Sequence, residues 1–153
     1  MIGLMALLLG ASDPGMTPLD FLVGHCWRGN LPKAGQQDTH CFTRLDDGRI
    51  KDSHKVSQDG KPVFGGDTFY SWDTGATVIR YVYTDDAGGR MTGTVTPGQN
   101  GVLNFLDGVY VDGDGGRIAI KVTWTRDGDG WTAVETSPDM PALDRTTHYT
   151  RVD

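Results

Sequence analysis

No run of apolar residues in this 153-residue sequence is long enough to cross a bilayer as a helix, which takes roughly 20 residues. The longest run, at 2–11, fits the apolar region of a secretory signal, with small residues at 10–12 near a cleavage point. The alternative is an N-terminal helix that packs on the rest of the chain. We therefore assign 1–15 to a signal segment or an N-terminal helix, and 16–153 to one domain.

Basic residues are too few and too scattered to form a nucleic-acid surface. The formal net charge is -6, and the 14 Lys and Arg residues lie between acidic ones. A nucleic-acid footprint needs a clustered basic face, and a membrane-surface patch needs a run of Lys and Arg. We therefore expect neither nucleic acid nor a membrane surface as a partner.

Several well-known catalytic motifs are also missing. The sequence contains no Gly-x-Ser-x-Gly elbow, no phosphate-binding loop, no dinucleotide fingerprint after a strand and no His-Glu-x-x-His pair. We assign no catalytic residue and no metal ligand, and an enzyme is the less favoured interpretation.

From residue 20 onward no helical periodicity extends beyond two turns. Instead, runs rich in Val, Thr, Tyr, Phe and Trp alternate with Asp-Gly, Gly-Gly and Pro-Gly turns, a pattern typical of successive β-strands. Ten antiparallel strands in sequence order form a meander, and closure into a barrel removes its exposed edges. We predict an all-β meander barrel with a helical turn at 17–20 and strands at 21–30, 37–45, 49–57, 62–72, 77–84, 90–96, 102–111, 117–126, 131–137 and 144–152.

Two similar turns, at 45–49 and 57–61, decide which side chains face inward. Each has Asp-Gly at its centre, which fits either a two-residue type I′ turn or a three-residue loop with a left-handed glycine. A one-residue slip between these alternatives moves every side chain to the other face. We prefer the three-residue loops, which place His40 opposite His54, Phe42 opposite Asp52 and His54 opposite Phe64.

The first hairpin contains both cysteines of the chain. If it is symmetric, Cys26 lies opposite Cys41, close enough for a disulfide in the narrow, non-hydrogen-bonded type of pair. A bridge requires an oxidising compartment, and the apolar segment at 2–11 independently favours export to the periplasm or the medium. The alternative is two reduced, partly buried thiols in a cytoplasmic protein.

The same registers place His25, His40, His54 and Asp52 on neighbouring rows inside the barrel. Imidazoles and a carboxylate in one patch suit zinc binding or acid–base chemistry. The alternative is that each histidine hydrogen-bonds to a neighbour in a partly hydrated interior. Since no local spacing motif supports a metal, we leave the metal unassigned.

A glycine and a tryptophan at the start of the first strand, with an aromatic residue and an arginine in the last, resemble the calycin β-barrels. These are the lipocalins, the fatty-acid-binding proteins and the nitrobindins. Gly24, Trp27, Gly29 and Arg151 carry the resemblance, and the stretch at 21–29 is most similar to small bacterial lipocalin-like proteins. The resemblance implies a barrel over 20–153. Through the nitrobindins it also implies haem held by one histidine near the last strand, for which His148 is the nearest equivalent.

The expected function is the binding of one small hydrophobic or amphipathic ligand inside the barrel. The expected apolar walls are Trp27, Phe42, Phe64, Tyr70 and Trp72. The expected polar anchors are His40 and His54, together with Arg80 if it points inward. Two alternatives stay open: an enzyme or haem protein that uses the interior histidines, and a structural or envelope-interaction module with a filled core.

Overall fold

The computed structural model describes residues 13–153, so the apolar segment at 2–11 lies outside the described residues. The described chain contains two short 3-10 helices, η1 (Pro14–Leu19) and η2 (Pro141–Leu143). The strands are β1 (Cys26–Asn30), β2 (Gln36–Arg44), β3 (Ile50–Gln58), β4 (Lys61–Asp73), β5 (Val78–Asp85), β6 (Arg90–Pro97), β7 (Val102–Val111), β8 (Arg117–Ala119), β9 (Lys121–Asp127), β10 (Gly130–Thr136) and β11 (Arg145–Arg151). No helix within residues 13–153 is long and apolar enough to cross a bilayer.

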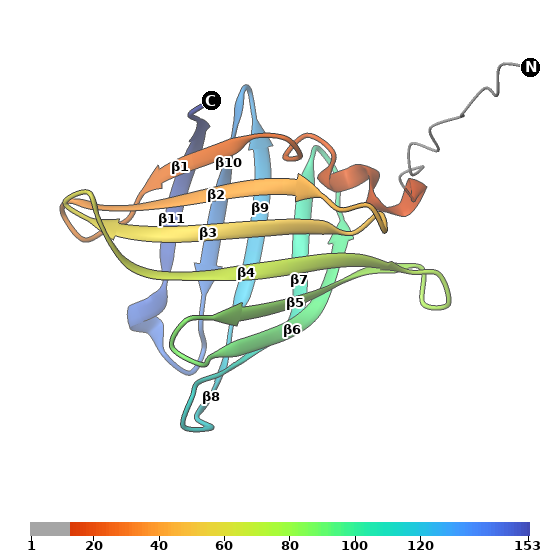
Figure 1. Ribbon diagram of the computed structural model, residues 1–153. Coiled ribbons are helices and arrows are strands. Elements are labelled where there is room, and N and C mark those ends of the chain that lie inside the picture. Colours follow the sequence, from red (N-terminus) through yellow and green to blue (C-terminus); the bar gives the residue numbers. More distant parts are fainter. Residues whose placement is uncertain (1–12) are drawn as a thin grey trace, which may run out of the picture.

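The strands form one closed antiparallel barrel (Figure 1). Consecutive strands pair with one another from β1 to β8 and from β9 to β11, and the pairing of β1 with β11 closes the sheet. β8 and β9 lie on either side of Ile120 and both pair with β7, so they share one place in the barrel. The 11 strands therefore fill ten places, and the predicted meander barrel is confirmed.

The segment before β1 departs from the prediction, because the first strand begins at Cys26 rather than at residue 21. Gly24 has a φ of 83°, a left-handed conformation that ends regular strand alternation and suits glycine. Leu22, which comes before this turn, is fully buried. His25, expected inside, lies at the barrel end beside Arg151 and is about one-third exposed.

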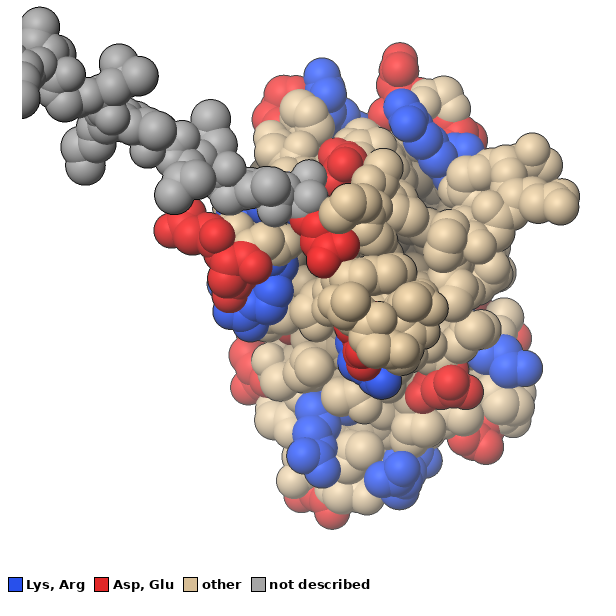
Figure 2. All heavy atoms as spheres, turned by 90° about the vertical axis from the view of Figure 1, so that its right-hand side faces the viewer, with Lys and Arg blue, Asp and Glu red and all other residues tan. Residues whose placement is uncertain are grey.

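η1 closes the barrel end at which β4 ends and β5 begins. Met16 and Leu19 of η1 are buried, together with Leu22. A helical turn was predicted at 17–20, and the observed helix begins three residues earlier, at Pro14, with Asp13 as its N-cap. On the described part of this end, acidic and basic side chains are interspersed, and neither sign forms a continuous patch (Figure 2).

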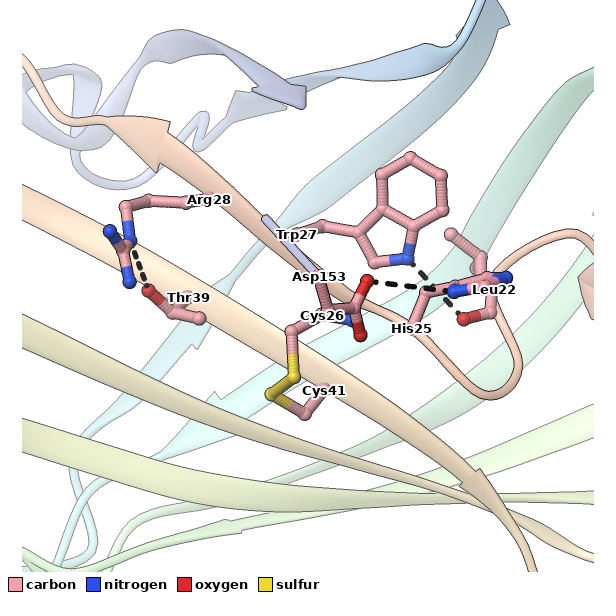
Figure 3. The surroundings of a disulfide bond; sticks show 8 residues. All are labelled: Leu22, His25, Cys26, Trp27, Arg28, Thr39, Cys41 and Asp153. Carbon is pink, nitrogen blue, oxygen red and sulfur yellow. Dashed lines mark hydrogen bonds and ion pairs between the residues drawn. A yellow bond between two sulfur atoms is a disulfide. The ribbon is translucent and has the colours of Figure 1, made fainter. Parts of the chain in front are cut away.

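A disulfide between Cys26 and Cys41 joins β1 to β2 (Figure 3). The two residues are direct cross-strand partners, as predicted, and their Cα atoms are 4.1 Å apart. The Cys26 N–H donates to the Asp153 carboxylate, and the Cys26 carbonyl accepts from the Val152 N–H. Since both backbone groups of Cys26 point away from β2, the pair is the narrow, non-hydrogen-bonded type that suits a bridge.

The turn between β2 and β3 is the predicted three-residue loop. Leu45 pairs with Arg49 through a 2.8 Å hydrogen bond, and Gly48 has a φ of 86° at the end of the loop. The register places His40 opposite His54, as predicted. Phe42 likewise lies opposite Asp52.

The turn between β3 and β4 corrects the second prediction. Asp59 and Gly60 have φ values of 51° and 79°, which make a two-residue type I′ turn rather than a three-residue loop. A bulge then shifts the register between Val56 and Ser57 and restores the alternation of faces. As a result, Phe64 lies opposite Val56 rather than His54.

The barrel interior is divided along its length. The half next to η1 is filled by apolar side chains. These are Met16, Leu19, Leu22, Trp27, Phe42, Ile50, Ile79, Val95 and Leu103. The other half encloses a cavity, which extends toward the end where β10 leads into η2. The fold therefore separates a packed half from a half with room for a ligand.

Candidate functional site

A cavity of about 390 Å³ occupies the η2 half of the barrel, and aromatic side chains from β4 to β11 form a large part of its wall. The aromatic lining consists of Phe64, Tyr70, Tyr81, Tyr83, Phe105, Tyr110, Trp124, Trp131 and Tyr149. Pockets that bind small molecules fall in this size range, and they combine such apolar walls with a few converging polar groups.

The polar groups gather on the inner faces of β2 and β3. Asp38 and His40 are two residues apart on β2, so both point inward, and His54 lies opposite His40 on β3. Asp38 Oδ2 lies 3.0 Å from His40 Nε2, and Asp52 Oδ2 lies 2.8 Å from His40 Nδ1. Asp38 Oδ1 lies 3.1 Å from His54 Nδ1. We call these four residues, Asp38, His40, Asp52 and His54, the His–Asp cluster.

Both ring nitrogens of His40 face carboxylate oxygens, which accept but do not donate when ionised. His40 is therefore an imidazolium that donates from both nitrogens. Burial by itself would lower the pKa of His40, but the charges of Asp52 and Asp38 and the hydrogen bonds to both outweigh burial and raise it to about 10. The cluster fixes one positive charge between two carboxylates.

Asp38 holds the cluster together, because its carboxylate accepts from three side chains. Two are His40 and His54, and the third is the Tyr149 hydroxyl at 3.0 Å from Oδ2. Burial would raise the pKa of Asp38, but the charge of His40 and the hydrogen bonds from His40 and His54 hold it well below its usual range. Asp38 therefore stays ionised although it is only 3% exposed.

Tyr83 connects the cluster to the cavity wall. Its hydroxyl lies 3.1 Å from His54 Nε2, on the opposite side of the ring from Asp38. Burial and then the charge of Asp85 raise the pKa of Tyr83 well above its usual value, so the hydroxyl keeps its proton. In the tautomer with Nδ1–H on Asp38, His54 Nε2 accepts from this hydroxyl.

Two buried polar atoms beside His40 have no hydrogen-bond partner within the described protein. One is Asp52 Oδ1 and the other is Trp131 Nε1. Asp52 bonds to His40 through its other oxygen, and the Trp131 ring lies edge-to-face with the His40 ring at 5.7 Å. An unpaired buried polar group costs about 1–3 kcal/mol. This part of the wall thus offers one free acceptor and one free donor.

The loop between β10 and β11 covers the cavity with Met140 and Leu143. The Asp139 carboxylate fastens the loop to β8 by accepting from the Ala119 N–H at 2.7 Å. At the base of the loop, Arg145 donates to Glu135 at 2.8 Å, and both side chains line the cavity. Apart from the His–Asp cluster, this ion pair supplies the only charges among the lining residues.

The structure brings together only some of the residues expected to form the site. His40, His54, Phe64 and Tyr70 line the cavity. Trp27 and Phe42 are buried in the filled half, where the Trp27 Nε1–H donates to the Leu22 carbonyl. These positions do not test whether a ligand binds. Of the six residues, only His40, His54, Phe64 and Tyr70 could contact a ligand in the cavity.

The three remaining candidates lie away from the cavity. Trp72 is partly buried beside η1, against Gly15. Arg80 points outward, where it pairs with Asp73 at 2.6 Å, so the condition for its role as an anchor is not met. His148 is 54% exposed on the outer face of β11 and lies beside Asp127 and Thr132.

Among the residues joined by hydrogen bonds in and around the His–Asp cluster, the sequence analysis missed three: Asp38, Tyr83 and Tyr149. Asp38 had a signal, since it is two residues before His40 and shares its face. Tyr83 and Tyr149 had none, because β5 and β11 reach the cluster only through the curvature and closure of the barrel.

The comparison with solved structures agrees with this architecture. The chain is similar to the crystal structure of Rv2717c from M. tuberculosis, with a TM-score of 0.65 and 13% sequence identity over 94% of this chain and 100% of that chain. The shared fold is a closed antiparallel β-barrel, which agrees with the barrel implied by the resemblance to the calycins. At 13% identity, the similarity between the two proteins shows a common fold and nothing more. No protein-family model matches the chain, and neither does any curated protein.

Proposed function

We propose that this calycin-like barrel binds one small amphipathic molecule in the η2 half of its interior. The observation that carries the proposal is the contrast between the two halves, one filled and the other holding a cavity of about 390 Å³. A filled core, which would suit a purely structural module, does not agree with that cavity. The aromatic wall supplies apolar contact for the body of the ligand.

The polar part of the ligand would lie against the His–Asp cluster. His40 and His54 are the least buried members, with side chains 13% and 12% exposed, whereas Asp38 and Asp52 are almost fully covered. Nearby, Asp52 Oδ1 and Trp131 Nε1 lack partners, so a small adjustment of either side chain would let a ligand hydroxyl or amide complete the hydrogen bonding. This supports a ligand with one polar end rather than a pure hydrocarbon.

Haem does not fit this interior through the residue expected to hold it. His148 lies on the outer face of β11, and its Nδ1 already faces Thr132 and Asp127. Its ring cannot serve as an axial ligand to a group in the cavity without reversal of the strand. We therefore derive no chemistry through haem.

The test uses N-phenyl-1-naphthylamine, a small apolar dye whose fluorescence rises when it leaves water. Ala133 lines the cavity from β10, and its neighbour Val134 is 42% exposed on the outer face. Ala133→Phe fills the cavity and is expected to weaken dye binding about tenfold or more, equivalent to ~1.4 kcal/mol. Val134→Phe adds a similar ring outside the barrel and should bind the dye like the wild type.

Two results would overturn the proposal. One is an absence of dye binding to the folded wild-type protein at any concentration below the solubility of the dye. The other is equal binding by wild type and Ala133→Phe, which would place the dye outside the cavity. A circular dichroism spectrum that matches the wild type establishes that each variant is folded.

We further propose that the protein works in an oxidising compartment, the periplasm or the medium. The disulfide between Cys26 and Cys41 supports this, because such bridges persist mainly in exported proteins. Alkylation of the thiols in fractionated cells, before and after reduction, should find the bridge intact in the periplasmic or secreted fraction. Two freely alkylated thiols in that fraction would contradict the proposal.

A further inference from the structure

Three side chains of the His–Asp cluster place metal-ligating atoms around one point. Asp38 and His40 share a face of β2, and His54 is the direct cross-strand partner of His40. One ligand atom from each of the three lies within 4.8 Å of the other two. A pair two residues apart plus a cross-strand neighbour is the simplest way for a β-sheet to present three ligands to one ion.

We propose that Asp38, His40 and His54 form a binding site for a divalent transition-metal ion of the zinc or ferrous-iron type. Two imidazoles and one carboxylate are the donor set that these ions take, particularly in sites that retain an open position. Calcium and magnesium are excluded by the donors, because both ions need about six or more oxygen ligands.

The distances between the donors suit such an ion. His40 Nε2 and His54 Nδ1 lie 3.0 Å and 3.1 Å from the two oxygens of Asp38. Ligands held about 2.0 Å from a tetrahedral ion are about 3.3 Å apart, close to these two separations. One ring nitrogen of each histidine lies within 4.8 Å of the other, so the two rings must approach each other. The two rings are nearly parallel, at 21°, and binding turns them toward each other about χ2, a soft torsion in histidine.

Each proposed ligand already has a partner that orients it. The His40 Nδ1–H donates to Asp52, which leaves Nε2 for the metal. The far nitrogen of His54 contacts the Tyr83 hydroxyl, and the Tyr149 hydroxyl donates to Asp38. Metal-bound histidines almost always hydrogen-bond through their second nitrogen in this way, because the bond fixes the tautomer and the ring orientation.

Metal binding would exchange one proton for the ion. His40 releases its Nε2 proton to solution and keeps its Nδ1 proton, which it donates to Asp52. In His54 the proton moves from Nδ1 to Nε2, where it is donated to the Tyr83 oxygen, and the Tyr83 hydroxyl turns its own proton away. Each histidine then offers one ring nitrogen to the ion and keeps its orienting hydrogen bond through the other.

The remaining coordination position of the ion would face the cavity, because the histidines are the cluster members exposed there. Three protein ligands and one open position are typical of metals that bind or activate a small molecule, rather than of closed structural sites. The metal site depends only on Asp38, His40 and His54. It can therefore exist whether or not the proposed organic ligand binds.

The test is a titration of the full-length, chelator-treated protein with Co²⁺ and Zn²⁺, followed by visible absorption and calorimetry. The wild type should bind one ion per chain and show d–d bands of nitrogen-ligated cobalt. His54→Gln removes one ligand and should lose more than about 100-fold in affinity, while Asp52→Asn, which changes only the orienting partner, should lose about 10- to 100-fold. Mg²⁺ should not compete.

His148→Gln is the matched control, because His148 also lies beside a carboxylate, Asp127 at 3.4 Å, but on the outer surface. It should bind cobalt like the wild type. The proposal is overturned if the wild type gives no cobalt spectrum, or if His54→Gln and the wild type bind equally. It is also overturned if His148→Gln is the variant that loses binding. Should His54→Gln fail to fold, Tyr83→Phe tests the same ring through its orienting partner, with an expected loss of about tenfold.

Discussion

At the scale of single residues, His40 contacts more members of the cluster than its neighbours do, through both ring nitrogens and both ring faces. Its ring stacks between Phe42 and His54, and the Tyr149 ring lies edge-on at 5.2 Å. Its two N–H groups neutralise carboxylates that are 3% and 2% exposed, Asp38 and Asp52. A buried ion pair contributes less than its Coulomb energy, because both partners lose their hydration. Removal of one partner is a different matter, since the others then stay buried without compensation.

We therefore expect His40→Gln to destabilise the protein by about 3–5 kcal/mol, the usual cost of breaking a buried pair. The measurement is urea unfolding followed by tryptophan fluorescence. The double variant with Asp52→Asn should recover part of the loss, because it also removes one uncompensated charge. A loss below about 1 kcal/mol would mean that His40 is not charged in the folded protein.

The same residue predicts how stability depends on pH. In the unfolded chain the pKa of histidine is about 6.5, and in the folded protein the pKa of His40 is about 10. Between these values only the folded state holds the proton, so the free energy of unfolding should fall as pH rises through this window. Below the window the contribution is complete.

Asp38 acts in the opposite direction, because its folded pKa is lowered. Its contribution is present above about pH 4 and is lost as the pH falls toward the folded value. Asp38 and His40 together should therefore make the urea midpoint highest between about pH 4 and 6.5, in a series measured from about pH 4 to pH 10. His40→Gln should flatten the alkaline limb, and an unchanged slope in that variant would assign the alkaline loss to other groups.

At the scale of elements, the bridge between β1 and β2 closes a loop across 15 residues of sequence. Chain-entropy arguments give about 3 kcal/mol of stabilisation for a loop of this length. The double variant Cys26→Ser and Cys41→Ser should therefore unfold about 3 kcal/mol more easily than the oxidised wild type. A reducing agent should lower the stability of the wild type by a similar amount and leave the double variant unchanged. If the reductant destabilised both proteins equally, the effect would not come from the bridge.

The turns show how far local sequence determines an element. Asp-Gly stands at the centre of both hairpins that flank β3, yet one forms a three-residue loop and the other a type I′ turn. Either turn is compatible with Asp-Gly, so the choice depends on what the following strand can absorb. β4 accommodates the shorter turn with a bulge that leaves Val63 56% exposed. No local pattern in the sequence marked Val63 for that position.

At the scale of the whole molecule, the strand order and the closed meander were predictable from turn spacing, and the boundaries of most strands agree with the prediction. The pairing of His40 with His54 followed from one turn assignment. The cavity did not follow, because it depends on which half of the barrel the chain fills. η1 and Leu22 fill one half, and the left-handed Gly24 separates them from the regular alternation of β1. The direction of the Arg80 side chain could not be predicted either, because β5 carries apolar residues on both faces.

The loop over the cavity predicts where a ligand enters the barrel. The loop between β10 and β11 covers the cavity with Met140 and Leu143, and Asp139 fastens it to β8. If the cavity binds a ligand as proposed, Asp139→Ala should loosen this cover without changing the cavity wall. Association and dissociation of the naphthylamine dye should then both accelerate by about three- to tenfold, the equivalent of a net hydrogen bond of ~0.5–1.5 kcal/mol, while the dissociation constant stays nearly unchanged.

Asp129→Ala makes the same chemical change in the exposed turn between β9 and β10, at the η1 end of the barrel. Stopped-flow fluorescence should give wild-type rates for this control. A change in the dissociation rate alone would mean that Asp139 stabilises the bound state rather than the cover. Wild-type rates in Asp139→Ala would instead place the entrance elsewhere on the barrel rim. Faster rates in Asp139→Ala together with wild-type rates in Asp129→Ala would locate ligand entry at the η2 end, where the cavity lies.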